Sequence, residues 1–150
     1  MIALLQRVTQ ASVTVDGETV GAIAPGAPGV LVFLGVMATD GDAQVTRLAE
    51  RVAGYRILND AQGRPGRSVL DVPGASFLVV SQFTLGADTR KGRRPDYGAV
   101  AKGEQAESLY ESFVAALRAH GAPVETGRFG AMMQVALVND GPVTFRLEVE

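Results

Sequence analysis

Alternating and continuous apolar runs dominate the first part of the chain and predict β-strands. Residues 3–8 and 12–15 form two such runs, and residues 18–23 return after Asp16-Gly17, a dipeptide suited to a tight hairpin turn. Residues 30–36 are apolar throughout, which predicts a strand that is covered on both faces. The N-terminal part of the chain is therefore expected to form a sheet.

In two later segments the apolar positions recur at threes and fours, which predicts amphipathic helices. The first begins near residues 39–42, with Thr39, Asp40 or Asp42 as its N-cap, and has Gly54 near its end. The second ends at His120-Gly121, and its apolar stripe consists of Leu109, Tyr110, Phe113, Val114 and Leu117. We interpret His120 as a helix-end residue, because no Cys, second His or clustered carboxylates accompany it as a metal or catalytic site would require.

The last segment predicts two strands, residues 133–138 and 143–149, around Asn139-Asp140-Gly141-Pro142. A Gly-Pro bond is one of the few peptide bonds that can be cis at a modest cost, ~0.5–1 kcal/mol relative to trans. A cis bond would turn two successive carbonyls in the same direction. A plain turn is the alternative.

Composition favours one globular domain, residues 1–150, with 47% hydrophobic and 20% charged residues. No apolar run approaches the roughly 20 residues of a membrane span, so we expect a cytoplasmic protein with no membrane contact. The absence of Cys excludes disulfides and thiolate catalysis. Lys and Arg number 14 against 16 Asp and Glu, so any contact with nucleic acid must come from a local basic patch.

The most suggestive polar pattern follows the apolar run 77–80. Alternation from Ser81 to Leu85 predicts that the strand continues, with Gln82 and Thr84 on one face and Ser81, Phe83 and Leu85 on the other. Four cations follow in the next loop: Arg90, Lys91, Arg93 and Arg94. Hydroxyl and amide groups beside these cations could hold a carbonyl and a phosphate, and an ordinary strand end beside a solvated basic loop is the alternative.

Four stretches together resemble the D-aminoacyl-tRNA deacylases, and the likeness runs almost from end to end. They are Leu5-Gln6-Arg7-Val8 with Ala11-Ser12-Val13, Ser81-Gln82-Phe83-Thr84 with Asp88 to Pro95, Gly127-Arg128-Phe129-Gly130, and Asn139-Asp140-Gly141-Pro142-Val143-Thr144. The sequence departs from the family pattern at Pro65-Gly66, where Met-Asn is expected, at Gly86, where an aromatic residue is usual, and at Met132, where a polar residue is expected. None of these departures falls within the Ser81–Thr84 motif or the Gly-Pro pair.

The resemblance implies an α+β fold in the broad α/β class, with antiparallel and mixed sheets curled towards a barrel and two main helices. It implies hydrolysis of the ester that joins a D-amino acid to the terminal ribose of tRNA, with glycyl-tRNA as a further substrate. No cofactor and no metal are expected. The implied partners are the acceptor end of aminoacyl-tRNA and a second copy of the chain, and no DNA is expected.

The resemblance also assigns roles to individual residues. The catalytic set is Ser81, Gln82, Phe83 and Thr84, and Gly141 and Pro142 act in the other subunit, where their carbonyls hold the α-amino group and leave no room for an L side chain. Arg7 and Met133 support the Gly-Pro loop. The phosphates of tRNA would be bound by Arg90, Lys91, Arg93 and Arg94.

The chemistry leaves alternatives open at two residues. Thr84 is the obvious hydroxyl but has no base in its motif, so we prefer it as a positioning group, with the N–H groups of Phe83 and Thr84 for the oxyanion and the substrate 2′-hydroxyl for proton transfer. Phe83 could stack on the terminal adenine or lie in the core. Two rival functions are a non-catalytic RNA-binding module and a metal-dependent esterase.

Overall fold

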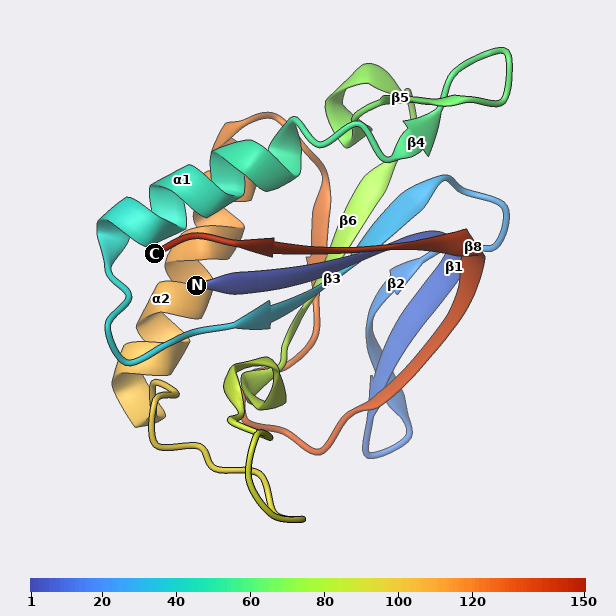
Figure 1. The fold of residues 1–150 in the computed structure, drawn as a ribbon. Helices are drawn as coiled ribbons and strands as arrows, with labels where there is room; N and C mark the ends of the chain where they lie inside the picture. The colour runs from blue at the N-terminus through green and yellow to red at the C-terminus, as the bar shows by residue number, and fades with distance from the viewer.

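The first strand, β1, organises the sheet by pairing with three others. In the computed structural model, which describes residues 1–150, β1 (Ile2–Val15) runs antiparallel to β3 along its first half, to β2 along its second half, and to β8 along both (Figure 1). The strand order is β2-β1-β3-β6-β7, with β8 on the other side of β1. The remaining strands of this sheet are β2 (Glu18–Ile23), β3 (Gly29–Gly35), β6 (Ser76–Ser81), β7 (Val124–Thr126) and β8 (Gln134–Glu148).

Two helices, α1 (Asp42–Ala53) and α2 (Gly103–Ala119), pack against each other on one face of the sheet (Figure 1). A small second sheet pairs β4 (Leu58–Asn59) with β5 (Pro65–Arg67), and the two 3-10 helices are η1 (Val69–Asp71) and η2 (Phe83–Gly86). No helix combines the length and the apolar character needed to cross a bilayer.

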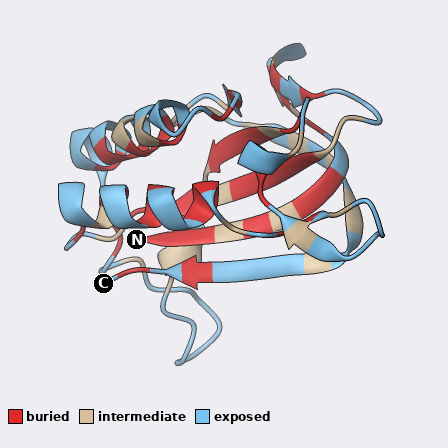
Figure 2. Ribbon diagram, turned by 90° about the horizontal axis from the view of Figure 1, so that it is seen from above, coloured by how far each residue is buried: buried red, intermediate tan, exposed pale blue.

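Both faces of the central strands are buried, because alternate side chains enter two separate apolar clusters (Figure 2). In β3, Val30, Val32 and Leu34 point into the large cluster under the helices, whereas Leu31 points into a smaller cluster within the curve of the sheet. This double burial explains why residues 30–36 are apolar throughout.

The sheet curls until its outer strands β2 and β7 approach each other. At Gly21 of β2 an added Cβ would lie 2.2 Å from the carbonyl oxygen of Thr126 in β7, so only glycine allows this approach. The predicted fold class, a mixed sheet curled towards a barrel with two main helices, is therefore confirmed.

Several predicted boundaries were wrong. The two N-terminal strands are one continuous strand, β1, and the two C-terminal strands are one interrupted strand, β8. Residues 59–66 contain many turn-forming residues, which predicts a loop, but Pro65 and Gly66 belong to β5. The N-cap of α1 is Gly41, because the Asp40 carboxylate instead accepts hydrogen bonds from the Met1 amino group (2.6 Å) and the Met37 N–H (2.7 Å). Both helices and the C-cap position of His120 agree with the sequence pattern.

Candidate functional site

The candidate site lies where three parallel strands end together. Strand β6 runs parallel to β3 on one side and to β7 on the other, so the carboxyl ends of all three strands face the same edge of the sheet. Ligands of sheets with parallel strands commonly bind beyond these ends. The segments that follow the strands here contain Val36, Ser81 to Phe83, and Phe129.

The Ser81–Thr84 motif does not continue the strand, contrary to the sequence prediction. Strand β6 ends at Ser81, and the chain turns at Gln82 into η2. The Gln82 N–H still donates to the carbonyl of Leu34 in β3 (2.7 Å), but the Gln82 carbonyl accepts from the Leu85 N–H (3.2 Å) and so starts the turn. The predicted alternation of faces therefore ends at Ser81.

Within this turn the Thr84 hydroxyl donates to the Gln82 side-chain oxygen at 2.7 Å. The N–H groups of Phe83 and Thr84 precede the first hydrogen bond of the turn, the position in which helical N–H groups lack a partner within the helix. No His, Lys or carboxylate is hydrogen-bonded to the Thr84 hydroxyl. The motif thus offers hydroxyl and amide groups but no adjacent general base.

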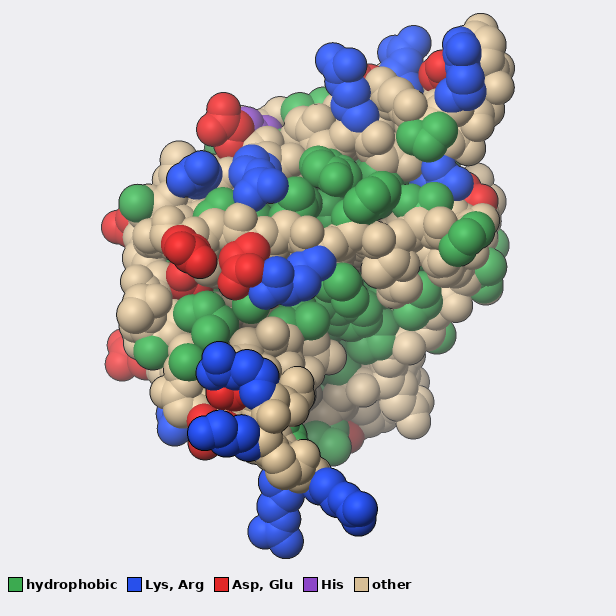
Figure 3. Space-filling model, in the orientation of Figure 1, with side chains coloured by type: hydrophobic (Ala, Val, Ile, Leu, Met, Phe, Trp, Pro, Cys, Tyr) green, Lys and Arg blue, Asp and Glu red, His purple; other side chains and the backbone are tan.

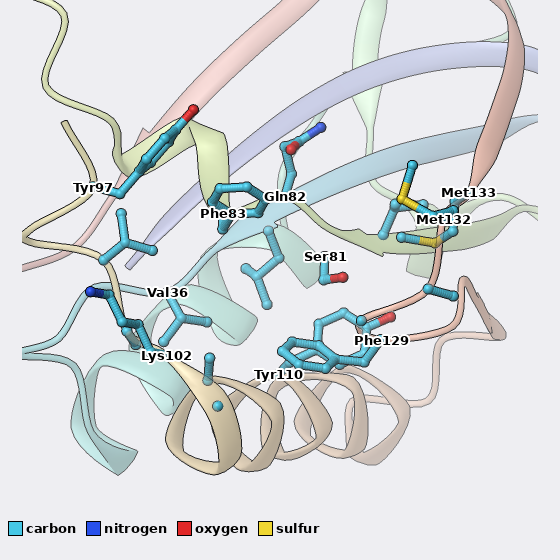
Figure 4. A pocket seen from close by; sticks show the side chains of 18 of the residues that line it. Val36, Ser81, Gln82, Phe83, Tyr97, Lys102, Tyr110, Phe129, Met132 and Met133 are labelled. Atoms are coloured by element: carbon cyan, nitrogen blue, oxygen red, sulfur yellow. The ribbon is translucent and has the colours of Figure 1, made fainter. Parts of the chain in front are cut away.

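A cavity of about 760 Å³ opens beside the motif (Figure 4). Ser81, Gln82 and Phe83 line it, whereas Thr84 lies outside its wall. Its lining is mainly apolar, and Lys102 is its only charged side chain. The aromatic rings around it are those of Phe83, Tyr97, Tyr110 and Phe129.

Phe83 does not lie in the core, so one of its two predicted alternatives is wrong. Its side chain is 57% exposed, and its ring packs against Tyr97 with the centroids 5.1 Å apart (Figure 4). An exposed ring at the mouth of an apolar cavity is free to contact a flat ligand.

Tyr110 is the buried polar group of the cavity wall. Its hydroxyl donates to the carbonyl of Val79 at 2.9 Å, and its ring centroid lies 5.7 Å from that of Phe129. Burial raises the pKa of Tyr110 to about 12, so the phenol stays protonated at neutral pH. Tyr110 therefore fixes α2 against β6 and does not act as a base.

The basic residues lie on a loop that projects from the end of η2. Reciprocal backbone hydrogen bonds between Asp88 and Asp96 close this loop at its base (2.8 and 3.0 Å). Arg90 pairs with Asp88 at 2.6 Å, and its hydrogen bonds lower the pKa of that carboxyl. The side chains of Lys91, Arg93 and Arg94 are exposed and form no ion pair. Lys and Arg side chains project at the lower end of the molecule in Figure 3.

The Gly-Pro pair interrupts strand β8. Gln6 of β1 faces Thr144 and Val8 faces Asn139, so the four residues 140–143 bulge out opposite Arg7 alone. The Gly141–Pro142 peptide bond is cis, which is the first of the two sequence-based alternatives. The segment is therefore a bulge in β8, opposite β1, and not a hairpin between two strands.

Polar side chains hold this bulge from both sides. The Arg7 guanidinium donates through Nε to the Asp140 carbonyl (3.0 Å) and through Nη1 to Asn59 Oδ1 (2.6 Å) and the Ile57 carbonyl (3.2 Å). Asn139 Nδ2 donates to the carbonyls of Arg7 and Val143, both at 2.9 Å. The predicted contact between Arg7 and this loop is present.

Met133 does not lie beside the Gly-Pro pair of its own chain. It directly precedes the first residue of β8, whereas the Gly-Pro pair lies in the middle of that strand, and it lines the cavity together with Met132, which is 92% exposed. At Gly86, another departure from the family pattern, the Met37 sulfur lies 2.6 Å from where a Cβ would be. Met37 thus fills space that a larger residue would need.

Sequence reasoning missed several residues of the cavity. Tyr97 and Lys102 carried no signal, because they lie in segments without apolar periodicity. Tyr110 belonged to the apolar stripe of α2, and Phe129 belonged to the Gly127–Gly130 motif, but neither pattern placed them near Ser81. The pairing of β6 with β7 and the packing of α2 against both strands bring Tyr110 and Phe129 close to Ser81.

Comparisons with known proteins agree with this architecture. A family described as D-Tyr-tRNA(Tyr) deacylase matches residues 4–148. A protein of Chloroflexus aurantiacus named D-aminoacyl-tRNA deacylase is 57% identical over 99% of this chain and 90% of its own length. A protein of the same name from Idiomarina loihiensis is 53% identical over 99% of this chain and 100% of its own.

Two solved structures share the fold over nearly the whole chain. A structure titled c-Myc DNA Unwinding Element Binding Protein has a TM-score of 0.91 at 40% identity and covers 100% of this chain, with 99% of its own chain covered. A probable eukaryotic D-amino acid tRNA deacylase has a TM-score of 0.80 at 19% identity, with 99% and 98% covered. The full-length identity to named deacylases, together with the matching family model, shows that this chain belongs to the D-aminoacyl-tRNA deacylase family.

Proposed function

We propose that this protein hydrolyses the ester bond of D-aminoacyl-tRNA and releases free tRNA and the D-amino acid. The observation that carries the proposal is the folding of Ser81–Thr84 into a turn beside an apolar cavity ringed by aromatic side chains. The cavity would take the terminal adenosine, with Phe83 against the base, and the turn would face the ester. Glycyl-tRNA, which carries no side chain to exclude, is expected to be a further substrate.

The geometry of the turn favours catalysis without an enzyme nucleophile. Ester hydrolysis needs an attacking oxygen, a proton acceptor and donors for the developing oxyanion. The Thr84 hydroxyl donates to Gln82 and has no base beside it, so it is better suited to positioning than to attack. The N–H groups of Phe83 and Thr84 would stabilise the oxyanion, and the ribose 2′-hydroxyl of the substrate would relay the proton.

Selection against L-aminoacyl groups is assigned to Gly141 and Pro142 of a second chain in a homodimer. Exposed apolar side chains support such an interface: Val138 and Phe145 on β8 are 46% and 42% exposed, and hydrophobic side chains form bands across the face over which β8 runs (Figure 3). Arg7 binds the carbonyl of Asp140 and Asn139 binds that of Val143, so the residues on both sides of the Gly-Pro pair are held. The carbonyls of Gly141 and Pro142 would bind the α-amino group and exclude an L side chain by contact.

The basic loop is the proposed contact for tRNA phosphates. Lys91, Arg93 and Arg94 are exposed and unpaired, whereas Arg90 is already bound to Asp88. Phosphate contacts of this kind position a nucleic acid without reading its sequence. We propose tRNA and not DNA as the partner, and a cytoplasmic location, where aminoacyl-tRNA is found.

One assay separates this function from its rivals. The protein is incubated with a D-aminoacyl-tRNA and its L counterpart, each with and without EDTA, and release of the amino acid is followed. We expect release from the D substrate alone and no effect of EDTA. Binding of both substrates without release would favour an RNA-binding module, and loss of activity with EDTA would favour a metal-dependent esterase. Competition by a DNA oligonucleotide tests the expected preference for RNA.

A further inference from the structure

A second cavity, of about 490 Å³, shares two of its lining residues with the first. Tyr110 and Phe129 line both cavities, so the two lie next to each other along α2. The first cavity uses the beginning of the helix and the second uses the part that follows, from Glu107 to Arg118. A strand of nucleic acid that leaves the first cavity along α2 would therefore enter the second.

The second cavity differs from the first in its charges. It is lined by two acids, Glu107 and Glu111, and two bases, Arg118 and Arg128. None of the four forms a salt bridge, although all line the same cavity. Arg118 is held by a hydrogen bond to the Val124 carbonyl at 3.0 Å. The cavity therefore presents separate hydrogen-bond acceptors and donors, and because its formal charges cancel it is not a general anion site.

An acceptor beside a donor matches the pairing edge of cytosine. This edge carries an amino group, which donates, next to a ring nitrogen and a carbonyl, which accept. Carboxylates accept from the amino group of cytosine, and proteins read unpaired RNA bases on this edge while stacking them on aromatic rings. Guanidinium groups supply the donors for the ring nitrogen and the carbonyl. Every tRNA carries cytidine before its terminal adenosine.

We propose that the second cavity binds this penultimate cytidine, with Glu107 accepting from its amino group and Arg128 donating to its ring nitrogen and carbonyl. Both residues are next to the first cavity along the chain, because Glu107 follows Ala106 and Arg128 precedes Phe129, whereas Arg118 is bound to the Val124 carbonyl. The assignment rests on the proposed function, which places the terminal adenosine in the first cavity. It gives a role to Arg128, the charged residue of the Gly127–Gly130 motif.

The test uses D-aminoacyl esters of three small substrates: adenosine, cytidylyl-adenosine and uridylyl-adenosine. Uridine replaces the amino group of cytidine by a carbonyl, which faces Glu107 as a second acceptor. For the wild-type protein we expect kcat/KM to be about tenfold higher for the cytidylyl than for the uridylyl substrate. Glu107→Gln should reduce this preference, because an amide can donate to the uridine carbonyl, while the N–H of the uridine ring still faces the Arg128 donor. Arg128→Ala should lower the ratio of dinucleotide to adenosine kcat/KM about tenfold.

Matched controls and the possible outcomes separate this inference from the proposed function. Glu104→Gln, on the same helix but outside both cavities, and Arg47→Ala, on α1, should leave all ratios unchanged. Equal cleavage of the cytidylyl and uridylyl esters by the wild type, or an unchanged preference in Glu107→Gln, would overturn the second site alone. Failure to cleave any D-aminoacyl ester, including D-aminoacyl-tRNA, would refute the proposed function and the site with it.

Discussion

Arg7 offers the sharpest test of how the Gly-Pro bulge is held. Its side chain is 10% exposed and joins the segment at Ile57 and Asn59 to Asp140 through four contacts between 2.6 and 3.2 Å. Arg7→Ala removes a largely buried charge and leaves its acceptors without their donor. A loss of about 2–4 kcal/mol in the free energy of unfolding is expected, because the acceptors at Ile57, Asn59 and Asp140 lose a charged donor, together with a fall of about 10 °C in the melting temperature.

Urea unfolding measures this change directly, provided that the m-value stays constant. Arg7→Lys should recover only part of the loss, because an ammonium group cannot reach Asp140 and Asn59 with a planar fork. Arg146→Ala is the matched control on β8: its pair with Glu148 is exposed on both sides, so we expect a change below about 1 kcal/mol. Arg7→Ala should also reduce the preference for D over L substrates. Unfolding of Arg7→Ala within about 0.5 kcal/mol of wild type would refute this account of the bulge.

Three further predictions follow from the site. Thr84→Ala should lower kcat about tenfold if the hydroxyl only positions the substrate, whereas a nucleophile would lose about 10⁴-fold or more; an acyl group trapped on Thr84 by acid quenching would contradict the positioning role. Replacing Arg93 and Arg94 by Ala should weaken binding to all tRNAs alike and reduce the slope of log affinity against log salt by about 1–2, and an unchanged slope would remove this loop from the interface. Tyr110→Phe should cost about 1 kcal/mol, because the Val79 carbonyl loses its hydrogen bond from the phenol and keeps only the one from the Gly127 N–H. Because the pKa of Tyr110 is raised to about 12 in the folded state, wild-type stability should fall as the pH rises above about 10, and this loss should be absent from the variant.

The helices were predictable because their signal is long. The stripe from Leu109 to Leu117 repeats over more than two turns, and the structure buries each of its residues. The strand 30–36 was equally clear, because both of its faces are covered and no polar residue interrupts it. The apolar stripe of α2 and the apolar run 30–36 depend only on which side chains are buried, and the order of apolar residues in the sequence shows this directly.

Two errors in the predicted strands occurred where the backbone pairing between strands is interrupted. The Asn139 amide donates to the carbonyls of Arg7 in β1 and Val143 in β8. Strand β8 therefore resumes its pairing with β1 after an interruption that the sequence suggested was a turn. Beyond Ser81, only four alternating residues suggested a strand, too few to separate it from a 3-10 turn. At the bulge the outcome depends on a side-chain contact between residues distant in sequence, from Asn139 to Arg7. After Ser81 it depends on the backbone hydrogen bond from the Leu85 N–H to the Gln82 carbonyl, which starts the turn.

The length of β8 supports the proposal that a second chain takes part in selection. Met133 lines the first cavity, and Gly141 lies eight positions further along the chain (141 minus 133). An extended strand of that length spans up to about 26 Å, whereas a carbonyl holds an amino group only within about 3 Å. This separation makes it difficult for the Gly-Pro pair, in the middle of β8, to bind an α-amino group beside the Ser81–Thr84 turn of its own chain, which supports the proposal of a second chain. A two-fold axis removes the difficulty, because each chain can then supply its bulge to the cavity of the other, and the substrate would be held at a site that neither chain completes alone.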